Sequence, residues 1–200
     1  MLRIRQVLVA VIAVGVVVAG FQLPSATTTP AAAAVIEIPT GHSKKHANQQ
    51  RRIAAMVRKA KAARVPKVRH GRVCPTKNFW IGAGWGAPRG KRLHRGIDLG
   101  AKRGTPIFAI EAGRINRTKK QSNGSLQIVM DGRSGSMFYY GHMDKVLVRS
   151  GQKVRRGQVI GIMGDTGSPG AVHLHFEYWK SGRESDAINP RKLIRQVCRK

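Results

Sequence analysis

Short apolar runs separated by glycine and turn residues fill the last two thirds of the chain. Runs of strand length, such as 125–130 and 136–140, are separated by Asp-Gly and Ser-Gly pairs, a pattern typical of a β-hairpin. From about Cys74 to Pro190 there is no helical period of useful length, and one short helix is expected at about 191–197. The pattern therefore predicts an all-β domain over residues 74–200: a small, mainly antiparallel β-sheet or β-roll with a short C-terminal helix.

Residues 1–34 carry a different pattern. Arg3 and Arg5 precede an uninterrupted apolar run over 7–21. The run has the length of the apolar region of a secretory signal and is shorter than the roughly 18 residues that a membrane span requires. Small residues at 32–34 offer a cleavage site. We expect this segment to be a signal peptide with the start of a linker. An uncleaved N-terminal anchor, which would attach the chain to a membrane, is the alternative.

A third pattern, over residues 35–73, predicts a basic, low-complexity and partly helical extension. Within it, Ile53, Met56, Val57 and Ala60 fall at i, i+3, i+4 and i+7, which is the period of an amphipathic helix. Arginine and lysine cover most of the other positions. The apolar stripe is thin, so a helix of this kind is marginal on its own.

The charge of the chain points to a polyanionic partner. The formal net charge is +28 and the isoelectric point is about 11.7. Residues 41–72 hold many lysines and arginines and no acidic residue. Export disfavours nucleic acid as the partner, and no nucleic-acid-binding motif is present. We therefore expect this segment to bind an anionic membrane or anionic cell-wall polymers. A basic spacer with a solvated surface is the alternative.

Cys74 and Cys198 are the two cysteines of the chain, and they bracket the β-rich part. In an oxidising compartment an even pair predicts a disulfide, which here would tie the two ends of the domain together. Two unrelated buried thiols are the alternative. Neither cysteine stands beside a plausible metal ligand, so we do not count them as ligands.

The stretch His173-Leu174-His175-Phe176-Glu177 is the richest in chemistry. Alternate side chains of a strand share a face, so the two histidines stand side by side while Leu174 and Phe176 turn toward a core. Two imidazoles on one face form a metal site or a proton-handling site. Taken alone, such a pair also arises by chance.

Two further stretches strengthen this interpretation. In His94-Arg95-Gly96-Ile97-Asp98, alternation places His94 and Asp98 on one face, with Gly96 leaving room for an ion between them. Nitrogen and oxygen ligands of this kind suit Zn²⁺, and three protein ligands leave a fourth position for water. His142 follows another strand-like run, 136–140. A surface His-Asp pair remains the alternative for the first stretch alone.

In order along the chain, the motifs HRGID, GTPIFA, YYGHM, GQVIG, GDTG and HLHFE resemble the lysostaphin/LytM-type zinc endopeptidases, which cut peptidoglycan peptides. The resemblance covers roughly residues 78–193 and leaves out 41–72. It implies the small β fold of these peptidases and a secreted or cell-wall location. Where relatives have Tyr-Ala-His, this chain has Tyr-Gly-His, ending at His142, a difference that bears on substrate shape more than on chemistry.

The resemblance also implies roles for five residues. His94, Asp98 and His175 would hold one zinc ion, and His142 and His173 would be catalytic without binding it. A peptide bond of peptidoglycan would then be hydrolysed by a zinc-activated water, in a protein that is expected to be a monomer. Some members of the family have lost ligands and act as regulators of other wall hydrolases. Because all five positions are present here, we expect an enzyme, with a non-catalytic wall-binding or activator protein as the alternative.

Several side chains have roles that the sequence leaves open. Glu177 is a candidate hydrogen-bond partner of a ligand histidine, with a structural role as the alternative. Trp80, Trp85, Tyr139 and Tyr140 are candidates for the walls of a substrate groove, and we expect at least half of them to be core residues instead. The scissile bond and any inhibitory role of the N-terminal extension also stay open.

Overall fold

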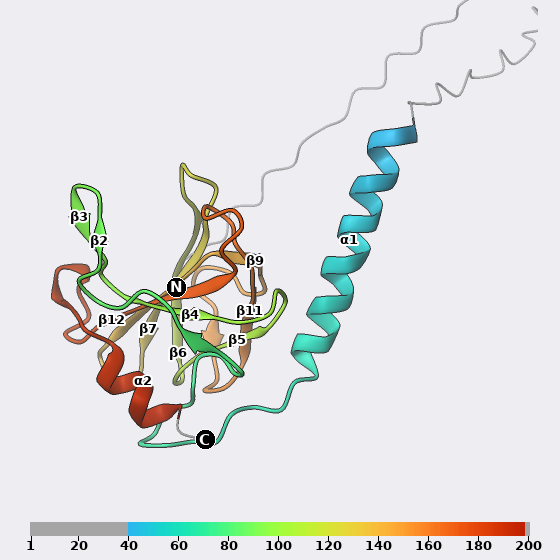
Figure 1. Cartoon of the computed structure of the whole chain (residues 1–200). Helices are drawn as coiled ribbons and strands as arrows, with labels where there is room; N and C mark the ends of the chain where they lie inside the picture. Colours follow the sequence, from blue (N-terminus) through green and yellow to red (C-terminus); the bar gives the residue numbers. More distant parts are fainter. Residues whose placement is uncertain (1–39, 199–200) are drawn as a thin grey trace, which may run out of the picture. The chain divides into compact units, whose positions relative to one another are not determined.

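The computed structural model describes residues 40–198, which form two helices, a short 3-10 helix and thirteen strands (Figure 1). The predicted signal segment lies outside the described residues. The largest sheet is antiparallel and places its strands in the order β1 (Trp80–Ile81), β4 (Ile97–Gly100), β12 (His173–Trp179), β8 (Met137–Gly141), β7 (Leu126–Gly132), β6 (Gly113–Lys120) and β10 (Lys153–Val154), with β13 (Ala187–Ile188) paired to β12.

Two smaller sheets complete the β structure. One has the order β5 (Pro106–Phe108), β11 (Val159–Met163) and β9 (Met143–Val146), and the other is the hairpin of β2 (Pro88–Arg89) and β3 (Arg92–Leu93), which projects from the domain in Figure 1. The 3-10 helix η1 (Glu184–Asp186) and helix α2 (Arg191–Val197) follow β12. The predicted fold class, including the hairpin of β7 and β8 and the C-terminal helix, is confirmed.

Alternation along the central strands gives the large sheet two chemically different faces. Side chains of one face are fully buried and join one hydrophobic core; they include Ile128, Met130, Phe138, Tyr140 and Phe176. The intervening positions on β7, β8 and β12 point to the opposite face, which is the floor of a polar groove. The core therefore fixes which side chains the groove receives.

A bulge in β6 changes the face that this strand presents. The pairing of β6 with β7 shifts between Ile115 and Arg117. Ile115 is buried in the core, whereas Arg117 and, two residues on, Lys119 line the groove. An extra residue in one strand of an antiparallel pair produces this change of direction. Without the bulge, alternation from Ile115 would place Arg117 and Lys119 on the core side. The bulge turns both cations toward the groove instead.

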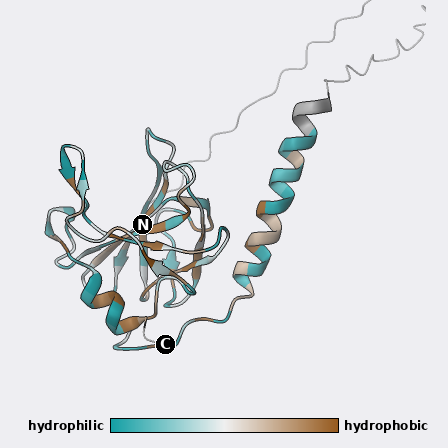
Figure 2. Ribbon diagram, in the orientation of Figure 1, coloured by the Kyte–Doolittle hydropathy of each residue, from teal (hydrophilic) through white to brown (hydrophobic). Residues whose placement is uncertain are grey.

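Helix α1 (Thr40–Lys61) contains the predicted amphipathic stripe. Ala60 is buried, and Ile53, Met56 and Val57 are partly buried, while the side chains between them are exposed. Figure 2 shows a mostly hydrophilic helix with few hydrophobic positions. Met56 lies against Gly104, which has φ +80° and no side chain to obstruct the contact. None of the helices within residues 40–198 is long and apolar enough to cross a membrane.

A disulfide joins Cys74 to Cys198, as the sequence predicts. The bridge closes a loop with a sequence separation of 124 and links the start of the β domain to the end of α2. Val197, the residue before Cys198, is buried in the core, so the covalent tie and the packing hold the same end of the chain.

Candidate metal centre and active site

Three potential metal ligands come together where β4 and β12 pair. The register places His175 opposite Asp98, and His94 lies just before β4. His94 Nε2 is 2.8 Å from His175 Nδ1, and Asp98 Oδ1 lies 3.1 Å from the first nitrogen and 2.9 Å from the second. Among residues 40–198, no other group of three or more His, Cys, Asp or Glu side chains has donor atoms close enough together to share a metal ion.

The donor set and its spacing suit zinc. Ligand atoms about 2.0–2.2 Å from a tetrahedral zinc are themselves roughly 3.4 Å apart, so a small outward movement of these side chains would accommodate the ion. From the sequence we expected Gly96 to leave room for an ion between His94 and Asp98, but the structure shows another reason for a glycine here. A side chain there would collide with the ring of His175, so Gly96 makes room for a ligand and not for the ion itself.

Hydrogen bonds orient both imidazoles of this group. His94 Nδ1–H donates to the carbonyl oxygen of Gly84 at 2.7 Å, which leaves Nε2 to bind a metal. His175 Nε2–H donates to Glu177 Oε1 at 3.0 Å, which leaves Nδ1 for the same purpose. Glu177 Oε2 accepts a second hydrogen bond, at 2.7 Å, from the indole N–H of buried Trp179. Partners of this kind fix the tautomer and ring direction of metal-binding histidines.

The local charges keep the carboxylates ionised. Burial disfavours the charged form of Asp98, but hydrogen bonds from His175 and His94, which form when the ring nitrogens facing Asp98 carry protons in place of a metal, outweigh it and hold the pKa of Asp98 well below its ordinary value. Arg89, from β2, also donates to Asp98 Oδ2 at 2.6 Å. For Glu177, burial is likewise outweighed, here by His175 and Trp179, and the pKa of Glu177 is lowered.

The two predicted catalytic histidines stand beside the three candidate ligands. Their ring centroids are 4.5 Å apart, and His173 Nε2 is 3.6 Å from Asp98 Oδ1. Each ring donates its Nδ1–H to a backbone carbonyl at 2.7 Å: His142 to Thr166 and His173 to Ala171. In the neutral form of each ring, this leaves the lone pair on Nε2. Burial lowers the pKa of His142, which favours its neutral form.

Thr166 holds the loop that orients His142. Its hydroxyl donates to the carbonyl oxygen of Met143 at 2.8 Å and accepts from the backbone N–H of Leu126 at 3.0 Å. The same loop is tied to the domain through Arg103, which pairs with Asp165 in the loop and with Asp144 on β9. His142 itself has φ 63°, in the left-handed region, so its position depends on these surrounding contacts.

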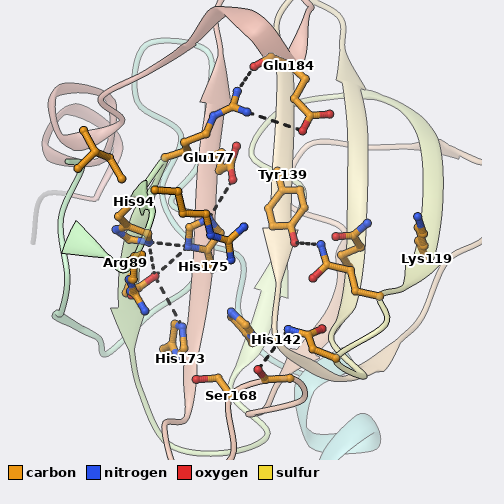
Figure 3. A pocket seen from close by; sticks show the side chains of 18 of the residues that line it. Arg89, His94, Lys119, Tyr139, His142, Ser168, His173, His175, Glu177 and Glu184 are labelled. Atoms are coloured by element: carbon orange, nitrogen blue, oxygen red, sulfur yellow. Dashed lines mark hydrogen bonds and ion pairs between the residues drawn. The ribbon is translucent and has the colours of Figure 1, made fainter. Parts of the chain in front are cut away.

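All five predicted site residues line one groove of about 470 Å³. Figure 3 shows His94, His173 and His175 grouped on one side of its floor, with Tyr139 and Lys119 across from them. Of the four candidate wall residues, Tyr139 lines the groove and Trp80 lines an adjoining hollow. Tyr140 is instead a buried core residue whose hydroxyl accepts a hydrogen bond from the N–H of Ile110. Trp85 is exposed and lines neither hollow.

Sequence reasoning missed several groove residues. Arg89 and Arg92 belong to a hairpin that the Arg-Gly-Lys-Arg turn before HRGID could have indicated. Thr166 lies in the GDTG motif, which predicts a loop but gives no sign that its carbonyl oxygen faces a histidine. The direction of Lys119 depends on the bulge, for which we see no sequence signal.

The fold and the site together define a peptidase-like domain with a candidate metal centre. Residues 92–190 match the profile of Peptidase family M23. The catalytic domain of lysostaphin from Staphylococcus simulans has a similar structure, with a TM-score of 0.53 and 34% identity over 59% of this chain and 93% of that one. The chain belongs to Peptidase family M23.

Curated relatives include both enzymes and an activator. The chain is 36% identical over 95 residues to the peptidoglycan DD-endopeptidase ShyA of Vibrio cholerae, covering 48% of this chain and 22% of that one. It is 33% identical over 131 residues to the murein hydrolase activator EnvC of Escherichia coli, covering 56% and 30%. It thus spans less than a third of the length of either relative.

Proposed function

We propose that the chain is a secreted zinc metalloendopeptidase that hydrolyses peptide bonds in the stem or cross-bridge peptides of bacterial peptidoglycan. The observation that supports this best is the tautomer pattern of the site. His94 and His175 turn one lone pair each toward Asp98, and His142 and His173 keep their Nε2 lone pairs beside them. A non-catalytic binding domain has no need for two further imidazoles held in this way.

In this proposal His94, Asp98 and His175 bind one zinc ion. When bound, zinc supplies a Lewis acid that polarises a peptide carbonyl and lowers the pKa of a water molecule. The neutral imidazole of His142 can accept a proton from the attacking water, because burial lowers its pKa and Thr166 holds its Nδ1–H. His173 stands next to Asp98, and its Nε2, once protonated, can donate a hydrogen bond to the oxygen on which negative charge develops.

The test is hydrolysis of purified peptidoglycan by the zinc-loaded full chain, followed by mass spectrometry of the released fragments. We expect new amino termini from the parent and none above background from His142→Ala. His46→Ala is the matched control, since it removes an exposed imidazole of α1, outside the groove, and should leave the rate unchanged. Release of the same fragments by His142→Ala would contradict the proposed role of that histidine.

An activator of other wall hydrolases is the second candidate, favoured by the similarity to EnvC. An activator and an enzyme differ in one simple mixing experiment. An activator releases no wall fragments alone and raises the rate of a separate wall hydrolase, whereas an enzyme releases its own fragments without that hydrolase. Activity that requires the second protein would favour the activator function.

We further propose that residues 74–200 form the peptidase domain and that the basic extension, residues 35–73, retains the protein on anionic wall polymers. Helix α1 carries seven exposed lysines and arginines and no acidic residue over its described side chains, so its attraction to a polyanion should be screened by salt. Deletion of 41–72 or high salt should weaken binding to whole cell walls. Unchanged binding in both cases would contradict this part of the proposal.

A further inference from the structure

The groove has two chemically different ends. In the order β1-β4-β12-β8-β7-β6, the metal ligands lie on or beside β4 and β12, with β1 on one side and β6 on the other. Trp80 comes from β1 and Lys119 from β6, so they lie on opposite sides of the metal centre. A peptide that crosses the strands would meet both environments.

The β1 side is the more apolar end. A hollow of about 440 Å³ adjoins the metal centre there and has Trp80 as its wall. Half of its other lining residues are glycine or alanine, among them Gly82, Ala83 and Ala171, and Arg89 and Asp98 border it on the side of the metal centre. The indole of Trp80 lies close against Gly100 and is 61% exposed. This end presents an aromatic surface and backbone, which suit a residue of the size of glycine or alanine.

The β6 side is cationic. Arg117 and Lys119, both on β6, line it, and Arg92 of β3 lines the same groove. The charge of Arg92, like that of Arg117, acts on the Tyr139 hydroxyl, where burial and nearby carboxylates raise the pKa. Gln127 lies directly opposite Lys119 in the strand pairing and is 95% buried, and its Oε1 has no hydrogen-bond donor within residues 40–198. A peptide N–H beside Lys119 could provide one.

The carboxylates of the groove are already committed. Asp98 contacts both ligand histidines, Glu177 bonds His175, and Glu184 is shared by two arginines. Within the described part of the chain, neither Arg92 nor Lys119 has a carboxylate within 4.0 Å. These two cations are thus available for a ligand that carries negative charge.

We propose that the groove recognises two features of a peptide. A residue bearing a free carboxylate lies over Arg92 and Lys119, and a glycine or alanine lies against Trp80. The inference rests on the proposed function, in that the same groove holds the substrate. Lys119 lies three strand spacings from β12, about 14 Å, which is roughly four residues of extended peptide. Recognition therefore extends well beyond the residues that flank the scissile bond.

Synthetic peptides test this directly. One set carries a side-chain carboxylate with an amidated C-terminus, a second carries a side-chain amide with a free C-terminus, and a third is amidated at both positions. Each set contains alanine or valine at the position expected to lie against Trp80. Binding to the zinc-loaded full chain is measured by calorimetry at low and high salt, and cleavage is measured in parallel. The first two sets distinguish the two sources of a carboxylate.

We expect one of the carboxylate sets to bind about fivefold to tenfold more tightly than the fully amidated set at low salt, with a smaller preference at high salt. Lys119→Gln and Arg92→Gln should each reduce that preference by about twofold to fivefold. Lys120→Gln and Lys91→Gln are matched controls, because each removes a neighbouring exposed lysine that does not line the groove. Alanine peptides should bind more tightly than their valine counterparts.

The outcomes separate this inference from the proposed function. Equal binding of all three sets, or equal effects of Lys119→Gln and Lys120→Gln, would overturn the inference even if every peptide is cleaved. A carboxylate preference that depends on Lys119 and Arg92, without cleavage of any peptide, would support the inference and count against an endopeptidase.

Discussion

Replacing Glu177 should weaken zinc binding although this residue is not a ligand. Its Oε1 accepts the Nε2–H of His175 at 3.0 Å, and its Oε2 accepts the indole N–H of Trp179 at 2.7 Å, so the carboxylate is fixed at both oxygens. Removing such a partner of a metal-binding histidine typically reduces metal affinity about 10- to 100-fold, or about 1.4–2.7 kcal/mol. Glu177→Leu removes both the charge and the acceptor, and we expect it to fall in this range.

A graded set of variants separates hydrogen bonding from charge. Glu177→Gln keeps an acceptor oxygen for His175 and should lose less than about tenfold. Glu184→Gln is the matched control, because it also removes a carboxylate that lines the groove but contacts none of the three ligands. We expect its zinc affinity to stay within about twofold of the parent.

The assay is competition for zinc with a chelator of known affinity at pH 7.5. Because Glu177→Leu also leaves the buried Trp179 N–H without its acceptor, we expect a loss of roughly 1–3 kcal/mol in unfolding free energy. Affinities are therefore measured well below the unfolding temperature of each variant. Zinc affinity of Glu177→Leu within twofold of the parent, in a folded protein, would refute the argument that Glu177 orients His175.

Three further predictions concern the disulfide, His142 and Thr166. Removing the disulfide with Cys74→Ser/Cys198→Ser opens a loop with a sequence separation of 124, for which the chain-entropy relation gives about 5 kcal/mol as an upper figure. Denaturant unfolding should therefore show a loss of several kcal/mol in the free energy of unfolding. A loss below about 1 kcal/mol would contradict this prediction. Burial lowers the pKa of His142 below 6.5 in the folded protein. As the pH falls, the unfolded chain therefore protonates this imidazole before the folded chain does. The contribution of His142 to stability should be present above pH 6.5 and decline below it. Urea unfolding of the parent and His142→Gln, at pH 7.5 and 5.5 in chelator, should therefore show the larger fall for the parent; equal falls would count against a buried neutral imidazole. Thr166→Val removes the hydroxyl that bonds Met143 and Leu126, and should reduce kcat while zinc binding is retained, whereas an unchanged kcat would show that the loop does not need it.

Periodicity in the sequence was enough to predict much of the fold. Alternation in the HLHFE stretch correctly separates Leu174 and Phe176, which are buried, from the histidines, which line the groove. The spacing of Ile53, Met56, Val57 and Ala60 likewise gives the less exposed stripe of α1. These predictions succeed because period-2 and period-3.6 patterns depend on the neighbouring residues alone.

Contacts between distant segments could not be predicted in the same way. The pairing of His175 with Asp98 depends on the register of two strands 77 residues apart in sequence, and local alternation contains no information on register. The use of Gly96 was predicted wrongly for the same reason, because the ring that fills the space beside it belongs to β12. Tyr139 and Tyr140 face opposite sides of β8, and alternation alone does not say which side is the core.

The measurement that tests the central claim most directly is zinc content per chain, determined together with peptidoglycan hydrolysis, for the parent, His175→Ala and His173→Ala. We predict about one zinc in the parent, because three ligands converge there. His175→Ala should lose both the metal and the activity, whereas His173→Ala should keep the metal and lose the activity. A parent chain that binds no zinc, or a His173→Ala variant that remains fully active, would contradict the assignment of the site.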